Sequence, residues 1–117
     1  MPLIVRNRTR DVLLADRASV AGTSAERRKG LLGRASLDTG EGLWIVPCES
    51  IHTFFMKFPI DVVFLSRQGE VLKIRPNLGQ WKIALSLRAH SVLELPGGIL
   101  ERTGTAVGDY LDLKETA

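Results

Sequence analysis

The sequence predicts an α+β fold that is mostly antiparallel β: a curled sheet or small barrel of seven to eight strands with one short helix. From residue 43 onward, short apolar and β-branched runs alternate with Gly- and Pro-containing turns, which is typical of strands. A helix signal occurs only at residues 24–32. A small domain with so many strands hides its sheet edges best by curling the sheet toward closure. The length of 117 residues predicts a single domain over 1–117.

The first third of the chain predicts two strands and the helix. Residues 3–5 form a short apolar run before a polar turn, and a second strand is expected over 12–21. Thr23 and Glu26 have the spacing of a capping box, in which hydroxyl and carboxylate satisfy each other's free backbone amides. We expect the helix to end at Gly33, with a glycine at position 30 that costs about 1 kcal/mol inside it.

The remaining strands follow from apolar runs. They are expected at residues 43–46, 51–56, 60–65, 71–74, 81–85, 91–95 and 110–113. The runs at 60–65 and 71–74 flank a short Gly-containing loop, which predicts a hairpin. Segments 96–98 and 103–109 are rich in glycine and are expected to be turns.

The charge is distributed unevenly along the chain. Residues 1–34 carry eight basic and three acidic side chains, whereas residues 35–117 carry eight basic and ten acidic ones. The aromatic residues begin only after residue 43, in apolar runs, so they do not interleave with the basic third. We therefore expect a solvated basic face and disfavour a nucleic-acid partner.

Several absences bear on location. The chain contains no run of about 18 apolar residues, so the sequence predicts no transmembrane helix, and no membrane partner is expected. The first residues lack the apolar stretch of a signal peptide. Cys48 is the only cysteine and cannot form an internal disulfide, which favours a reducing, cytoplasmic compartment.

The residues with reactive side chains gather between positions 47 and 61. Cys48 as nucleophile and His52 as its base would make a thiol-dependent enzyme, with Asp61 or Glu49 orienting the imidazole. Four residues of extended chain span about 13 Å, however, so a direct thiol–imidazole bond needs a bend. The alternative is that Cys48 is a small buried apolar residue. Cys48 and His52, with His90 as a distant third ligand, are also too few for structural zinc. We therefore expect no metal and no cofactor.

Two carboxylates interrupt apolar strands, namely Asp61 and Glu94. Burying an isolated charge is costly, so each is expected to be paired or to face a polar space. One possibility is ion pairs with the arginines at 27, 28 and 34, which would tie the helix to the sheet. The other is a polar pocket in which the arginines bind an anionic ligand in a bidentate manner.

Three groups of residues occur in order along the chain: Thr23-x-x-Glu26-Arg27-x-x-Gly30-Leu31-Leu32-x-Arg34; Gly42-Leu43-Trp44-Ile45 with Ile51-His52-Thr53-x-x-Met56-Lys57-Phe58-Pro59-Ile60-Asp61; and Val92-Leu93-Glu94-Leu95-Pro96-x-Gly98 with Gly104-x-x-x-Gly108-Asp109. Together they resemble the domain of unknown function family 192, an uncharacterised bacterial and archaeal group. The resemblance implies a small β-rich domain with one helix and no particular activity. Leu32 stands where the family usually has methionine, a swap that conserves volume.

From these observations we expect a non-catalytic module that binds a small molecule or a partner protein. The cleft would lie between the helix and the sheet, with an apolar floor and a few polar groups. Its expected lining residues are Arg27, His52, Phe54, Met56, Asp61 and Glu94. The alternative is the thiol-dependent, hydrolase-like enzyme that uses Cys48 and His52, so enzymatic activity stays open.

Overall fold

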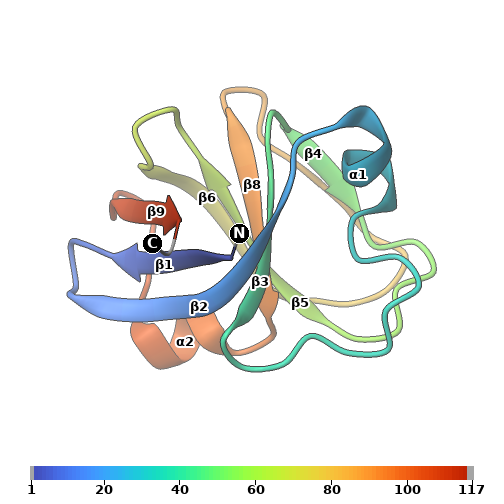
Figure 1. Ribbon diagram of the computed structural model, residues 1–117, viewed down its shortest axis with the longest axis horizontal. Helices are drawn as coiled ribbons and strands as arrows, with labels where there is room; N and C mark the ends of the chain where they lie inside the picture. Colours follow the sequence, from blue (N-terminus) through green and yellow to red (C-terminus); the bar gives the residue numbers. More distant parts are fainter. Residues whose placement is uncertain (1, 116–117) are drawn as a thin grey trace.

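A computed structural model describes residues 2–115, and within them the chain forms nine strands and two short helices (Figure 1). The elements in chain order are β1 Leu3–Asn7, β2 Val12–Ala21, α1 Ser24–Lys29, β3 Glu41–Ile45, β4 Ser50–His52, β5 Ile60–Leu65, β6 Val71–Leu78, β7 Ile83–Leu85, β8 Ser91–Pro96, α2 Ile99–Thr103 and β9 Leu111–Glu115.

Seven of these strands form one curled sheet in the order β6-β5-β8-β3-β2-β1-β9. Neighbouring strands are antiparallel except β2 and β3, which pair in parallel from Arg17 opposite Glu41 to Ala21 opposite Ile45. The curl brings the beginnings of the two outermost strands together. There the amide of Val71 donates to the carbonyl of Asp109, and that of Leu111 to the carbonyl of Gly69, both at 2.8 Å. The predicted α+β class and the curled, mostly antiparallel sheet are confirmed.

Two apolar clusters pack against the two faces of this sheet. The first fills the inside of the curl, where the α2 residues Ile99 and Leu100 join side chains from β1, β2, β5, β8 and β9. The second lies on the outer face of β3, β5 and β8. It is covered by Leu31 and Leu37 from the connection after α1, and by the separate β4–β7 ribbon. Both faces of β5 and β8 are therefore covered, and every residue of these two strands is buried.

The structure confirms the capping box and corrects the length of the first helix. The Thr23 hydroxyl accepts from the Glu26 amide at 3.1 Å, and the Glu26 carboxylate accepts from the Thr23 amide at 3.0 Å. The helix ends at Lys29, because Gly30 adopts a φ of 49° and caps it. This glycine is therefore the end of the helix, where positive φ is useful, and the predicted end at Gly33 is wrong.

Two other elements differ from the sequence prediction. The expected strand at 51–56 is only β4, Ser50–His52, and a turn follows it. A second helix, α2, follows Gly98, which takes a left-handed φ of 98°. The Pro and Gly residues before α2 predicted a turn, so the helix that follows them was not predicted. The predicted hairpin is confirmed, since β5 and β6 pair antiparallel.

Candidate functional site

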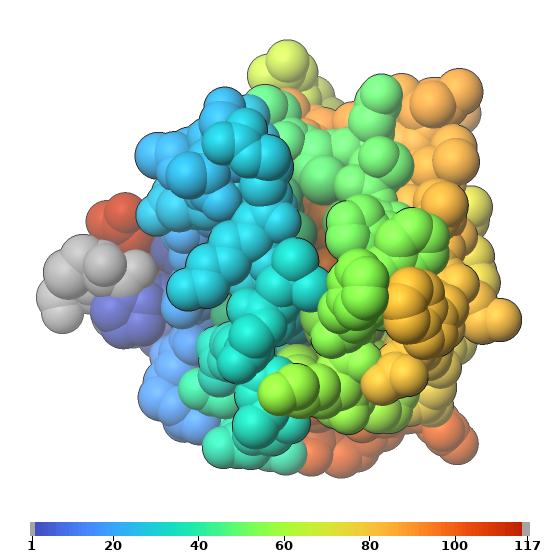
Figure 2. Space-filling model, turned by 90° about the vertical axis from the view of Figure 1, so that its right-hand side faces the viewer, coloured from blue at the N-terminus to red at the C-terminus, as the bar shows by residue number. Residues whose placement is uncertain are grey.

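A pocket of about 510 Å³ lies on the outer face of the sheet. One wall is α1 with the residues directly after it, and the other is the chain from the end of β3 through β4. Figure 2 shows the corresponding groove between the cyan segment and the green one. The pocket thus lies at the junction of helix and sheet, where the sequence predicted a cleft.

Four of the six predicted site residues line this pocket. They come from α1, from the end of β4, from the turn after it and from β8: Arg27, His52, Met56 and Glu94. Phe54 is not part of the lining. Its ring lies between those of His52 and Trp81, with centroids 4.9 and 5.6 Å away. Phe54 therefore belongs to an aromatic cluster at the surface beside the pocket.

Asp61 does not line the pocket either, because its side chain lies on the other face of β5. The residue is fully buried, and its carboxylate accepts hydrogen bonds from the backbone amides of Asn77 at 2.8 Å, Gly98 at 3.2 Å and Leu100 at 2.8 Å. These bonds hold the beginning of α2 against β5 and β6. The predicted ion pair of Asp61 with a helix arginine is wrong, since backbone amides satisfy the carboxylate.

Glu94 is the polar group at the base of the pocket. Only 4% of the residue is exposed, and it lies between Leu43 and Val62 on the neighbouring strands. Within residues 2–115, no hydrogen bond or ion pair reaches its carboxyl group. Burial raises the pKa of Glu94 to about 7. The pocket therefore contains a buried carboxyl group that is free to accept a donor and that changes its charge near neutral pH.

The helix side of the pocket is basic. The Arg27 guanidinium donates to the Gly22 carbonyl at 2.6 Å and contacts the Ser24 hydroxyl at 3.4 Å. Arg28 and Lys29 are exposed, and no carboxylate in the described part of the chain pairs with them. The predicted ion pairs of the arginines at 27, 28 and 34 with Glu94 do not occur among the described residues, and Arg34 pairs with Glu41 instead, at 3.0 Å. An anionic group entering the pocket would meet unpaired cations at this side.

Cys48 and His52 also line the pocket, and each contacts nearby backbone. The Cys48 thiol lies 3.1 Å from the Ser50 carbonyl, and His52 Nδ1 accepts from the Phe54 amide at 3.3 Å. Burial raises the pKa of the Cys48 thiol, and the nearby Glu94 raises it further. A thiol with a raised pKa is a poor nucleophile at neutral pH. His90 lines a neighbouring pocket, and no cluster of three metal-ligating side chains occurs within residues 2–115.

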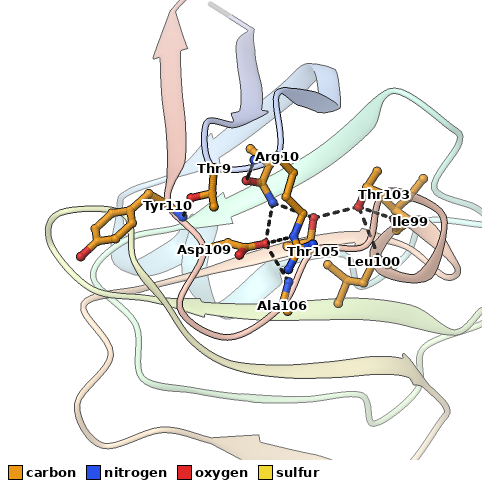
Figure 3. Close-up of polar contacts among 10 residues, drawn as sticks. Thr9, Arg10, Ile99, Leu100, Thr103, Thr105, Ala106, Asp109 and Tyr110 are labelled. Carbon is orange, nitrogen blue, oxygen red and sulfur yellow. Dashed lines mark hydrogen bonds and ion pairs between the residues drawn. The ribbon is translucent and has the colours of Figure 1, made fainter.

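A buried polar cluster at the far end of the sheet was missed by the sequence analysis (Figure 3). Asp109 accepts hydrogen bonds from the Asn7 side chain at 3.0 Å, from Arg10 Nε at 2.5 Å and from the Ala106 amide at 3.0 Å. Burial by itself would raise the pKa of Asp109, but these bonds outweigh it and lower the pKa. The cluster joins the β1–β2 turn to the turn before β9. Its partners are about a hundred residues apart in sequence, so no local pattern indicates them.

Comparison with known proteins supports the motif resemblance. The family model DUF192, described as "Uncharacterized ACR", matches residues 5–113. The chain belongs to the DUF192 family. A UPF0127 protein from Thermococcus sibiricus is 29% identical over 112 residues, which covers 91% of this chain and 71% of that protein. A UPF0127 protein from Pyrococcus furiosus is 34% identical over 76 residues, 60% of this chain and 65% of that one.

A solved structure has the same fold as this DUF192 domain. The crystal structure of a protein of unknown function from Novosphingobium aromaticivorans has a TM-score of 0.82 at 26% identity. The match covers 96% of this chain and 84% of that one. In the part of the chain that the structure describes, no helix is long and apolar enough to cross a membrane.

Proposed function

We propose that this DUF192 domain is a non-catalytic binding module for a small amphoteric molecule. The ligand would offer an amine group to Glu94 and a carboxylate group to Arg28 and Lys29. The observation that carries the proposal is the carboxyl group of Glu94, which is 4% exposed, has no partner in residues 2–115 and lines an open pocket.

The cost of burying this carboxyl group supports a ligand. A charged group that has lost most of its hydration is costly unless a donor contacts it, and the carboxyl oxygens of Glu94 remain accessible from the pocket, where a donor can reach them. The donor group of a ligand would recover that energy on binding, so Glu94 would contribute specificity as well as affinity. A volume of about 510 Å³ lies within the range of small-molecule pockets. Ile45, Ile51 and Met56 supply apolar lining around the carboxyl group.

The thiol-dependent enzyme is the less supported alternative. It requires a thiolate at neutral pH, whereas burial raises the pKa of Cys48. It also requires a base for the thiol, whereas the thiol contacts the backbone carbonyl of Ser50. The single cysteine supports our expectation of a reducing, cytoplasmic location.

The test measures the thermal midpoint of the protein with three groups of compounds: free α-amino acids, polyamines and dicarboxylates. Amino acids carry a positive and a negative charge, whereas polyamines carry only positive charges and dicarboxylates only negative ones. We expect the amino acids to raise the midpoint of the wild type and to fail to raise that of Glu94→Gln. The matched control is Glu101→Gln, because Glu101 is an exposed glutamate on α2. If no amino acid raises the midpoint, or if Glu94→Gln responds like the wild type, the proposal is wrong.

A further inference from the structure

The β4–β7 ribbon carries an exposed apolar surface that is separate from the lining of the pocket. Five large side chains on β7 and the turns around the ribbon are between 44% and 76% exposed. We call them the ribbon patch: Phe55, Trp81, Ile83, Leu85 and Leu87. In Figure 2 the green and amber segments that carry them lie side by side. A contiguous patch of this kind on a small protein usually marks a contact surface.

The backbone is strained at the two aromatic residues of the patch. Phe55 has a φ of 63° and Trp81 a φ of 61°, a left-handed conformation that is unfavourable for bulky side chains. Their rings meet edge to face at 4.8 Å. Strain of this kind persists only where the surroundings impose it, and it is concentrated at functional positions.

A buried threonine imposes this conformation on both turns. The carbonyl of Thr53 accepts from the amides of Met56 at 3.2 Å and Trp81 at 3.3 Å. Its hydroxyl donates to the Gly79 carbonyl at 2.6 Å and accepts from the Lys82 amide at 2.9 Å. Thr53 is 0% exposed, so these bonds are shielded from water. One buried residue thus holds two turns, through its carbonyl and its hydroxyl, and each turn presents an aromatic ring outward.

The charges around the patch are mostly positive. Residues 49–60 and 79–90 contain Lys57, Lys82 and Arg88 against a single carboxylate, that of Glu49, whose backbone carbonyl accepts from the Ser86 amide at 2.9 Å. All three cations are exposed. The patch therefore complements a negatively charged surface, whereas a second copy of the same patch would repel it.

We propose that the ribbon patch docks onto the surface of a lipid bilayer that contains anionic phospholipids. Trp81 and Phe55 would enter the interface between headgroups and acyl chains, and the three cations would contact lipid phosphates. The patch side chains line none of the three described pockets, so they suit a broad surface. The sequence prediction of no membrane partner considered only segments that cross the bilayer. The proposal does not depend on the pocket at Glu94.

The experiment is co-sedimentation of the full chain with two kinds of vesicle: phosphatidylcholine alone, and equal parts of phosphatidylcholine and phosphatidylglycerol. We expect retention by the anionic vesicles that weakens with salt. Trp81→Asn and Phe55→Asn remove the rings, and asparagine tolerates the left-handed backbone. Each change should weaken binding about tenfold. Removing the charge of Lys57 or Lys82 should weaken it about fivefold.

Two control variants show whether vesicle binding depends on the ribbon patch itself. Val107→Ser removes another exposed apolar side chain, 60% exposed in the turn before β9, and should leave vesicle binding unchanged. Glu94→Gln should also bind vesicles normally, whatever its effect on small ligands. The proposal is overturned if the anionic vesicles retain no protein or if Trp81→Asn binds like the wild type. It is equally overturned if the wild type self-associates through the patch and no vesicle competes.

Discussion

Glu94 and Asp61 lie on adjacent strands and face opposite sides of the sheet. Val62 is the residue directly across from Glu94, and Asp61 pairs with Leu95. Because successive side chains of a strand point to opposite faces, one position separates the two environments. Three backbone amides satisfy Asp61, whereas Glu94 lies at the base of a pocket with no partner within residues 2–115. Two carboxylates in similar sequence contexts thus have different roles.

Replacing Glu94 with glutamine is expected to reduce the pH dependence of stability. Burial raises the pKa of Glu94 from 4.5 to about 7, so the folded state binds more protons than the unfolded state between these values. The wild-type free energy of unfolding should therefore fall as pH rises through this window, by on the order of 3 kcal/mol. Glutamine has no proton to lose, so the free energy of unfolding of the variant should change less with pH. Urea unfolding at about pH 4.5 and about pH 8 measures the difference. If the free energy of unfolding changes equally with pH in the wild type and the variant, the burial of Glu94 is contradicted. Glu101→Gln is the control at an exposed glutamate.

Replacing Asp61 with asparagine is expected to destabilise the domain without affecting the pocket. The amide nitrogen of asparagine cannot accept the hydrogen bonds that one carboxylate oxygen now receives. The free energy of unfolding should fall by about 2–4 kcal/mol, because buried amides lose a charged acceptor. Urea denaturation measures this loss. As a control, Asp112→Asn breaks a surface pair with Arg8 at 3.3 Å and should cost less than about 1 kcal/mol. A cost for Asp61→Asn as small as the control's would mean that the carboxylate does not anchor α2.

A substitution at Gly69 tests the contact between the two ends of the curled sheet. Its φ is 85°, and a side chain there would overlap the carbonyl oxygen of Leu111. Gly69→Ala should lower the free energy of unfolding by about 2–4 kcal/mol, because both strain and overlap oppose it. Gly79→Ala provides the comparison, since a Cβ there meets no atom within 4 Å. If both variants unfold at the same denaturant concentration, the ends of the sheet do not meet as described.

The thiol of Cys48 is expected to react slowly at neutral pH. Burial raises its pKa, so the rate of alkylation by iodoacetamide should keep rising above the pH at which a free cysteine has ionised. Mass spectrometry of the alkylated protein at a series of pH values follows this rate, with the urea-unfolded chain as reference. An inflection near neutral pH would instead support the thiol-dependent enzyme.

The features that depend on local pattern were predictable from the sequence. The β5–β6 hairpin follows from two apolar runs around a glycine turn, and the α1 capping box from Thr23 and Glu26. The parallel pairing of β2 and β3 was not predictable. It depends on a crossover of residues 22–40, and no local turn signal specifies which strand the chain returns to. The helix α2 was not predicted because the glycines that serve as its caps also signal turns.

The pocket was predictable in part for similar physical reasons. Glu94 was expected in a cleft because a charge within an apolar run needs a special environment. Phe54 lies outside the pocket because the strand expected over 51–56 ends at His52, and a turn with Phe55 at a left-handed φ follows. Asp61 was misplaced because β5 is buried on both faces. An apolar run of this type predicts burial without indicating which face a polar residue serves.

The crossover between β2 and β3 forms part of the pocket but takes no part in the sheet. It supplies one wall of the pocket, whereas the ladder that joins the two strands involves only Arg17–Ala21 and Glu41–Ile45. Insertions or deletions among the exposed residues 33–36 would therefore leave every sheet hydrogen bond in place, whereas the flanking Leu31 and Leu37 belong to the core. The length of this surface loop can therefore vary while the sheet stays intact, provided that Leu31 and Leu37 keep their places in the core.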